Sequence, residues 1–70
     1  MESLSKRQKQ VYEFIDQYHT KQGIAPTIAE VARGIGTAHS TAAIYIDALK
    51  HKGFATSLEG IPRSLKVVGL

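Results

Sequence analysis

The sequence predicts a small, mainly helical α+β domain in which three helices precede a C-terminal two-stranded β-hairpin. Three observations lead to this prediction. Apolar residues recur at intervals of three and four in three successive segments, which is the period of an amphipathic helix. Residue types that favour helix starts precede these segments, and glycines follow them. After Gly53 the apolar period changes to two, which is typical of strands, and a Gly-Ile-Pro turn separates two such segments.

The composition indicates one ordinary globular domain, residues 1–70. A chain of 70 residues is near the size at which folding buries about 60% of the unfolded surface. There is no cysteine, which excludes disulfides and thiol-rich zinc sites. No apolar run is long enough to span a membrane, and the first residues lack the apolar part of a signal peptide, so we expect a cytoplasmic protein. The net charge of +3 is compatible with a nucleic-acid partner.

The first predicted helix covers about residues 6–22. Ser5 and Gln8 have the spacing of a capping box, and Gly23 supplies the left-handed residue that ends many helices. The first turn is basic, although the helix dipole disfavours cations there, and such conflicts are more common at functional sites. The alternative is a solvated surface turn without a partner.

Two further helices are predicted over about residues 28–35 and 38–52. Pro26 blocks continuation of the first helix, Thr27 and Glu30 form a second capping box, and Gly36 ends the short helix. We expect Thr37 to cap the next helix, and Lys50 and Lys52 to be explained by the dipole at its end. Two helices joined by a tight turn are typical of a helix-turn-helix, whose second helix enters the DNA major groove.

The predicted strands cover about residues 54–58 and 65–68. Phe54, Thr56 and Leu58 would share one face of the first strand, and Leu65 and Val67 one face of the second. The intervening turn contains a proline, which cannot pair inside a sheet, and basic residues follow it. A basic hairpin after three helices predicts a winged helix-turn-helix.

Three segments carry a closer resemblance: LSKRQKQVYEFIDQY, GIAPTIAEVARGIG and IDALKHKGF. They resemble the N-terminal DNA-binding domain of LexA-type repressors, which control the bacterial DNA-damage (SOS) response. The most specific elements are the opening L-[ST]-x-R-Q pattern and the P-T-x-x-E-[IV]-A pattern, and the match runs from Leu4 to about Val67. The resemblance implies a winged helix that binds double-stranded DNA sequence-specifically and regulates transcription, most simply as a repressor.

LexA-type repressors also contain a second domain with a self-cleaving serine–lysine site and the main dimer interface. The 70 residues contain neither, so we expect an isolated module, a small autonomous regulator of bacterial or phage origin, or a fragment of a longer regulator. High affinity would then require a homodimer on a palindromic site, or a missing dimerisation domain.

Candidate DNA-contacting residues fall into two sets. The start of the third helix would contact bases through polar side chains and through apolar groups that touch thymine methyls, namely His39, Ser40, Thr41, Ala43 and Ile44. This helix contains no arginine, asparagine or glutamine, the usual base-reading residues. Phosphates would be contacted from the helix starts and the hairpin tip by Lys6, Arg7, Lys9, Thr27, Arg63, Ser64 and Lys66.

Two other functional classes are an interaction module and an enzyme. Exposed apolar residues such as Ile44 also fit a winged-helix protein-interaction module, such as an antirepressor or assembly subunit with little DNA binding. An enzyme is not expected, because the three histidines lack metal-ligand spacing and no phosphate loop or catalytic set is present. We therefore predict no catalytic residues, no metal, no cofactor, no small-molecule ligand and no membrane partner.

Overall fold

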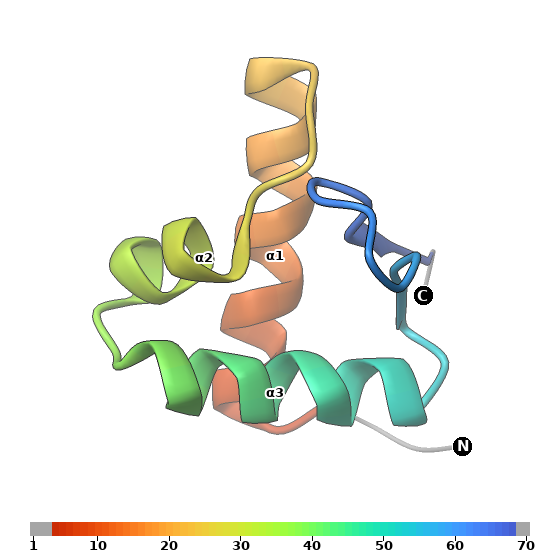
Figure 1. Cartoon of the computed structure of the whole chain (residues 1–70). Coiled ribbons are helices and arrows are strands. Elements are labelled where there is room, and N and C mark those ends of the chain that lie inside the picture. The colour runs from red at the N-terminus through yellow and green to blue at the C-terminus, as the bar shows by residue number, and fades with distance from the viewer. Residues whose placement is uncertain (1–3, 69–70) are drawn as a thin grey trace.

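The computed structural model describes residues 4–68 and contains three helices followed by a short antiparallel hairpin (Figure 1). The elements are α1 (Lys6–Gln22), α2 (Ile28–Ile35), α3 (His39–His51), β1 (Ala55–Thr56) and β2 (Lys66–Val67). This order confirms the predicted mainly helical α+β class and is consistent with a winged helix. Within residues 4–68, no helix is both long and apolar enough to cross a bilayer.

Both predicted capping boxes are present. At the start of α1, the Ser5 hydroxyl accepts from the Gln8 N–H at 3.2 Å, and the Gln8 side chain accepts from the Ser5 N–H at 3.0 Å. Thr27 and Glu30 repeat this arrangement at the start of α2. The α1 and α2 helices end at glycines in the left-handed region, where a residue without Cβ is unstrained.

The predicted cap of α3 is wrong. Thr37 still belongs to the turn that follows α2, because its N–H donates to the Ala32 carbonyl at 2.9 Å. The residue before α3 is Ala38, in an extended conformation, and no side chain caps the helix. The third helix therefore starts without the hydroxyl that stabilises α1 and α2.

The core lies where the three helices meet and is closed by the hairpin. Figure 1 shows α3 crossing the start of α1, with α2 on one side of α1 and the hairpin on the other. All three helices contact one another, α1 contacts β2, and α3 contacts β1. The buried cluster contains residues from the three helices and β1, with one more from the segment before β2: Val11, Ile15, Val31, Ala32, Ala42, Ile46, Leu49, Ala55 and Leu65. From β2, Val67 is partly buried and packs against this cluster.

The hairpin strands are shorter than the predicted ranges 54–58 and 65–68. Ala55 pairs with Val67 and Thr56 with Lys66, and one further backbone bond joins the Val68 N–H to the Phe54 carbonyl at 2.8 Å. Pairing stops there because the Ser64 hydroxyl lies within hydrogen-bonding distance of the Leu58 N–H (2.8 Å) and carbonyl (3.1 Å), so these groups turn inward within the loop.

The three residues predicted to share one face of the first strand do not all face the core. Ala55 is the buried residue of β1, while Thr56 and Leu58 are exposed, and Leu58 keeps 67% of its surface accessible. Phe54 does pack against the core, from just before the strand. We call the hairpin and its loop, residues 55–67, the wing.

Candidate nucleic-acid interface

The outer side of α3 carries the residues predicted to contact bases. His39, Ser40 and Ile44 are exposed, and Thr41 and Ala43 are partly exposed. The opposite side of the helix packs into the core through Ala42, Ile46 and Leu49, so the α-helical period fixes which residues can meet a partner. Ile44 is prominent, because 66% of its surface is accessible although it is a large apolar residue.

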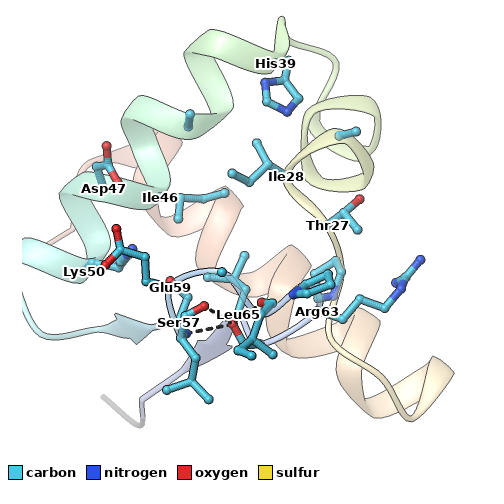
Figure 2. Close-up of a pocket in the computed structure, with 18 residues that line it drawn as sticks. Thr27, Ile28, His39, Ile46, Asp47, Lys50, Ser57, Glu59, Arg63 and Leu65 are labelled. Carbon is cyan, nitrogen blue, oxygen red and sulfur yellow. Dashed lines mark hydrogen bonds between the residues drawn. The ribbon is translucent and has the colours of Figure 1, made fainter.

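A groove separates α3 from the wing (Figure 2). It has a volume of about 460 Å³, and its walls come from the start of α2, from α3, and from the wing loop, residues 57–65. The groove brings together five of the predicted contact residues, which are far apart in the sequence: Thr27, His39, Ala43, Arg63 and Ser64.

Lys50 is a residue that the sequence reasoning missed. Its place at the end of α3 is explained by the helix dipole, but Lys50 also lines the groove together with His39, Ala43 and Asp47. Spacings of four, four and three place these residues on one side of α3. That period was visible in the sequence and could have identified Lys50. Asp47 on the same side opposes part of its positive charge.

The basic residues at the start of α1 lie outside the groove. Lys6, Arg7 and Lys9 are exposed and do not line it. The Arg7 guanidinium contacts Gln10 at 3.1 Å and the carbonyl of Ile35, the last residue of α2, at 3.4 Å. The start of α1 is therefore beside the end of α2.

The end of α3 also approaches the start of α1. The Lys52 ammonium donates to the Gln8 side chain at 2.9 Å. Since Gln8 belongs to the first turn of α1, this bond brings the cationic end of α3 next to the basic residues of that turn.

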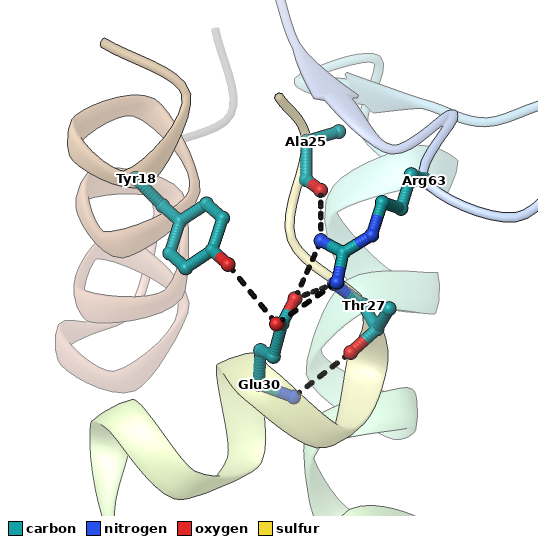
Figure 3. Close-up of polar contacts among 5 residues, drawn as sticks. All are labelled: Tyr18, Ala25, Thr27, Glu30 and Arg63. Atoms are coloured by element: carbon teal, nitrogen blue, oxygen red, sulfur yellow. Dashed lines mark hydrogen bonds and ion pairs between the residues drawn. The ribbon is translucent and has the colours of Figure 1, made fainter. Parts of the chain in front are cut away.

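Two predicted phosphate contacts of the wing loop are engaged within the protein. The Arg63 guanidinium forms an ion pair with Glu30 and also donates to the Ala25 carbonyl at 3.0 Å (Figure 3). The Ser64 hydroxyl contacts the backbone of Leu58 and Ile61 inside the loop.

Lys66 lies on a different side of the wing from the groove. It is exposed on β2 and lines a second, smaller cavity with Asp16 and His19 of α1. The groove does not include it.

The charge of Glu30 is stabilised by its partners. Hydrogen bonds from the Arg63 guanidinium, and then from the Thr27 backbone N–H, lower the pKa of the Glu30 carboxyl from 4.5 to about 2. The carboxylate is therefore ionised throughout the physiological range. Within residues 4–68, no three histidine or carboxylate side chains come together as a metal site.

Comparisons with known proteins agree with this arrangement. A family model described as the LexA DNA binding domain matches residues 1–64. The LexA repressor of Thermotoga petrophila is 34% identical over 67 residues, which are 96% of this chain and 34% of that protein.

Two further LexA repressors are similar to the same extent. That of Desulfatibacillum aliphaticivorans is 35% identical over 69 residues, which cover 97% of this chain and 34% of the relative. That of Carboxydothermus hydrogenoformans is 35% identical over 66 residues, which cover 93% of this chain and 32% of the relative. The chain spans about a third of the length of the curated relatives it matches.

Proposed function

The chain belongs to the LexA DNA-binding domain family, and from this premise we propose that it binds duplex DNA sequence-specifically as part of a transcriptional repressor. The α3 helix would enter the major groove, and the wing and the helix starts would contact the flanking backbone. The observation that carries the proposal is the exposed outer side of α3 beside the groove that the wing completes.

Base recognition would depend on few polar groups. Ser40 and His39 are exposed at the start of α3 and can donate or accept hydrogen bonds at base edges. Ala43 and Ile44 can contact thymine methyl groups, which distinguish thymine in the major groove. Thr41 is less accessible, so its contact would be peripheral. We therefore expect a preferred sequence that is rich in A·T pairs opposite the middle of α3.

Phosphate binding would come mainly from cations that lie near α3. We assign it to Lys6, Arg7 and Lys9 at the start of α1, to Thr27 at the start of α2, and to Lys50. Lys66 stays a predicted contact of the outer wing.

A single copy would bind weakly. A module of this size buries about 600–1,000 Å² on DNA, which is small for a specific complex. Two copies on a palindromic site, as a homodimer or through a further dimerisation domain, would supply the missing affinity. Two-fold related half-sites would then be about 34–36 Å apart, or a multiple of this spacing.

In vitro selection of duplexes bound by the 70-residue chain tests the proposal. We expect an enriched motif. The salt dependence of affinity, measured by anisotropy on the selected duplex, should have a log–log slope of about −3 to −4 per chain, because about 0.9 is expected for each of four phosphates neutralised. Absence of binding to any duplex at low salt would overturn it.

The exposed apolar residues favour one alternative outcome. Ile44, Leu58 and Ile61 keep 66%, 67% and 56% of their surfaces accessible. If the chain binds no DNA but captures a protein partner, and if Ile44→Ala abolishes that capture, the protein-interaction class is supported instead.

A further inference from the structure

We infer that Tyr18, Glu30 and Arg63 position the wing against the helices, so that Arg63 serves DNA binding by holding the wing rather than by contacting a phosphate. We call these three residues the Glu30 network. The inference rests on the proposed DNA binding. It also gives Arg63 a different role from the one that its basic character predicted.

Glu30 is the centre of the network (Figure 3). Its Oε1 accepts from the Thr27 N–H at 2.8 Å and from Arg63 Nη1 at 2.9 Å. Its Oε2 accepts from the Tyr18 hydroxyl at 3.0 Å and from Arg63 Nη2 at 3.1 Å. The carboxylate thus joins α1, the start of α2 and the wing loop, and the two-pronged contact with Arg63 fixes direction as well as distance.

The Arg63 side chain is exposed but is held toward the helices by several contacts at once. Besides the two bonds to Glu30, Nη1 donates to the carbonyl of Ala25, in the segment that leads into α2. The Arg63 backbone has a φ of 58°, a conformation that is disfavoured for a residue with a Cβ. A strained backbone persists when surrounding contacts determine it. Here the contacts of the Arg63 side chain with Glu30 and Ala25 hold the backbone in this conformation.

The wing needs such an attachment because its own pairing is small. Each strand has two residues, and a two-stranded hairpin alone is marginally stable in water. No residue from 57 to 64 is buried. Ser64 closes the loop on itself, but these contacts do not connect it to the helices. The Arg63 contacts do, because they reach Glu30 of α2 and the Ala25 carbonyl before it, and Arg63 also lines the groove.

The substitution Glu30→Gln separates two possible effects of Glu30 on DNA affinity, that of its negative charge and that of holding the wing, because they have opposite signs. Glu30→Gln removes a negative charge near the proposed DNA surface, which by itself would strengthen binding. The amide still accepts from the Thr27 N–H, as Gln8 does in the capping box of α1, so α2 keeps its start. Loss of the ion pair would loosen the wing and weaken binding.

Two further variants complete the comparison. Arg63→Lys keeps the positive charge, but an ammonium cannot form the paired contacts of a guanidinium. Glu59→Gln is the matched control, because Glu59 is exposed in the same loop, lines the same groove, and forms no hydrogen bond or ion pair among the described residues.

Affinity is measured on the duplex selected with the wild-type chain. We expect Glu30→Gln and Arg63→Lys each to lower affinity about twofold to fivefold, the range expected for a solvent-accessible ion pair, and the double variant to lower it no further than one single variant. Glu59→Gln should leave affinity unchanged or raise it. Tighter binding by Glu30→Gln, or wild-type affinity of Arg63→Lys, would overturn the inference.

Amide hydrogen exchange of the DNA-free chains separates this inference from the proposed function. Residues 57–65 should exchange faster in Glu30→Gln and Arg63→Lys than in Glu59→Gln, while the amides of α1 and α3 keep their protection. Unchanged exchange in the loop would overturn the network. If the wild-type chain binds no duplex but the loop loosens as expected, the network stands as a structural attachment and the proposed function fails.

Discussion

Gly34 occupies the last turn of α2, where the ring of Phe14 from α1 fills the space that a Cβ would take. A glycine inside a helix usually costs about 1 kcal/mol relative to alanine. Here the missing side chain lets the two helices approach closely. Phe14 packs against the core, and the centroids of its ring and of the Tyr18 ring are 5.8 Å apart. The glycine therefore contributes to packing although it weakens the helix.

Gly34→Ala should destabilise the chain despite the better helix propensity. The added methyl overlaps the Phe14 ring, and relief of such overpacking typically costs about 1–3 kcal/mol. Urea denaturation followed by circular dichroism measures the free energy of unfolding.

The control for this prediction places the same change in a Phe14→Ala background. Without the ring, Gly34→Ala should stabilise the chain by up to about 1 kcal/mol relative to Phe14→Ala alone. Equal effects in both backgrounds would show that the two positions do not interact.

Contacts between near neighbours in the sequence were predictable from residue types, and contacts between distant ones were not. Ser5 with Gln8, and Thr27 with Glu30, follow a local spacing rule, and both pairs form. Arg63 and Glu30 are 33 positions apart, and nothing local distinguishes a basic loop residue that pairs internally from one that is free to meet DNA. Gly34 and Phe14 belong to the same class of unpredictable contact.

At the scale of elements, α3 combines a buried side fixed by packing with an outer side left to function. The helical period identified its core residues and its exposed start. The same period places Lys50 on the side of α3 that carries His39 and Ala43, but the favourable dipole at the helix end is a sufficient local explanation for a lysine there, so the sequence alone does not point to its place in the groove.

The wing shows the converse limit of sequence reasoning. Alternating apolar residues predicted longer strands, whereas the Ser64 hydroxyl captures the Leu58 backbone and ends the pairing early. An alternating pattern of apolar residues does not reveal that the hydroxyl of Ser64, six residues from Leu58, binds the Leu58 backbone groups in place of a partner strand.

Lys50→Ala should weaken DNA binding to all sequences alike. Loss of one phosphate contact should reduce the log–log salt slope by about 0.9 and leave the selected motif unchanged. Anisotropy titrations at several salt concentrations measure both quantities.

Lys21→Ala provides the comparison for this element-scale prediction. Lys21 lies in the last turn of α1, is exposed, and does not line the groove. The substitution Lys21→Ala therefore removes one positive charge, as Lys50→Ala does, but from a site that is not proposed to contact DNA. An equal loss of affinity in both variants would mean that net charge alone, rather than the position of Lys50, determines binding.

At the scale of the whole molecule, Glu30 adds a polar connection between parts of the chain that the core joins through few residues of the wing. Tyr18 belongs to α1, Glu30 to α2 and Arg63 to the wing loop. Only one residue between positions 57 and 65 contributes to the buried cluster, namely Leu65. The attachment of the wing loop to the helices therefore has an electrostatic component that depends on pH.

Acid should remove this component within a defined range. Because the pKa of Glu30 is lowered from 4.5 to about 2, its charge contributes stability that is fully present above about pH 4.5 and is lost as the pH falls through about 2. The difference in the free energy of unfolding between wild type and Glu30→Gln should therefore be constant near neutrality and shrink between these values. Denaturant titrations across the acidic range measure this difference.

The variant Arg63→Lys tests whether Arg63 causes this pH dependence. It removes the main cause of the lowered pKa, so the contribution of Glu30 should be lost at a higher pH than in the wild type. A wild-type advantage over Glu30→Gln that persists undiminished to about pH 2 would contradict the low pKa of this carboxyl.

The separation between the core and the wing loop has a consequence for engineering and for evolution. Since no residue from 57 to 64 is buried, most of the loop can change in sequence or length while the folding equilibrium of the helices is preserved. Arg63 and Ser64 are the exceptions, because they shape and attach the loop. Gly60 is a further exception, because its φ of 76° is strained for a residue with a Cβ. A library that varies residues 58, 59, 61 and 62 and keeps Gly60 and the two anchors would explore new binding preferences on a scaffold of nearly constant stability.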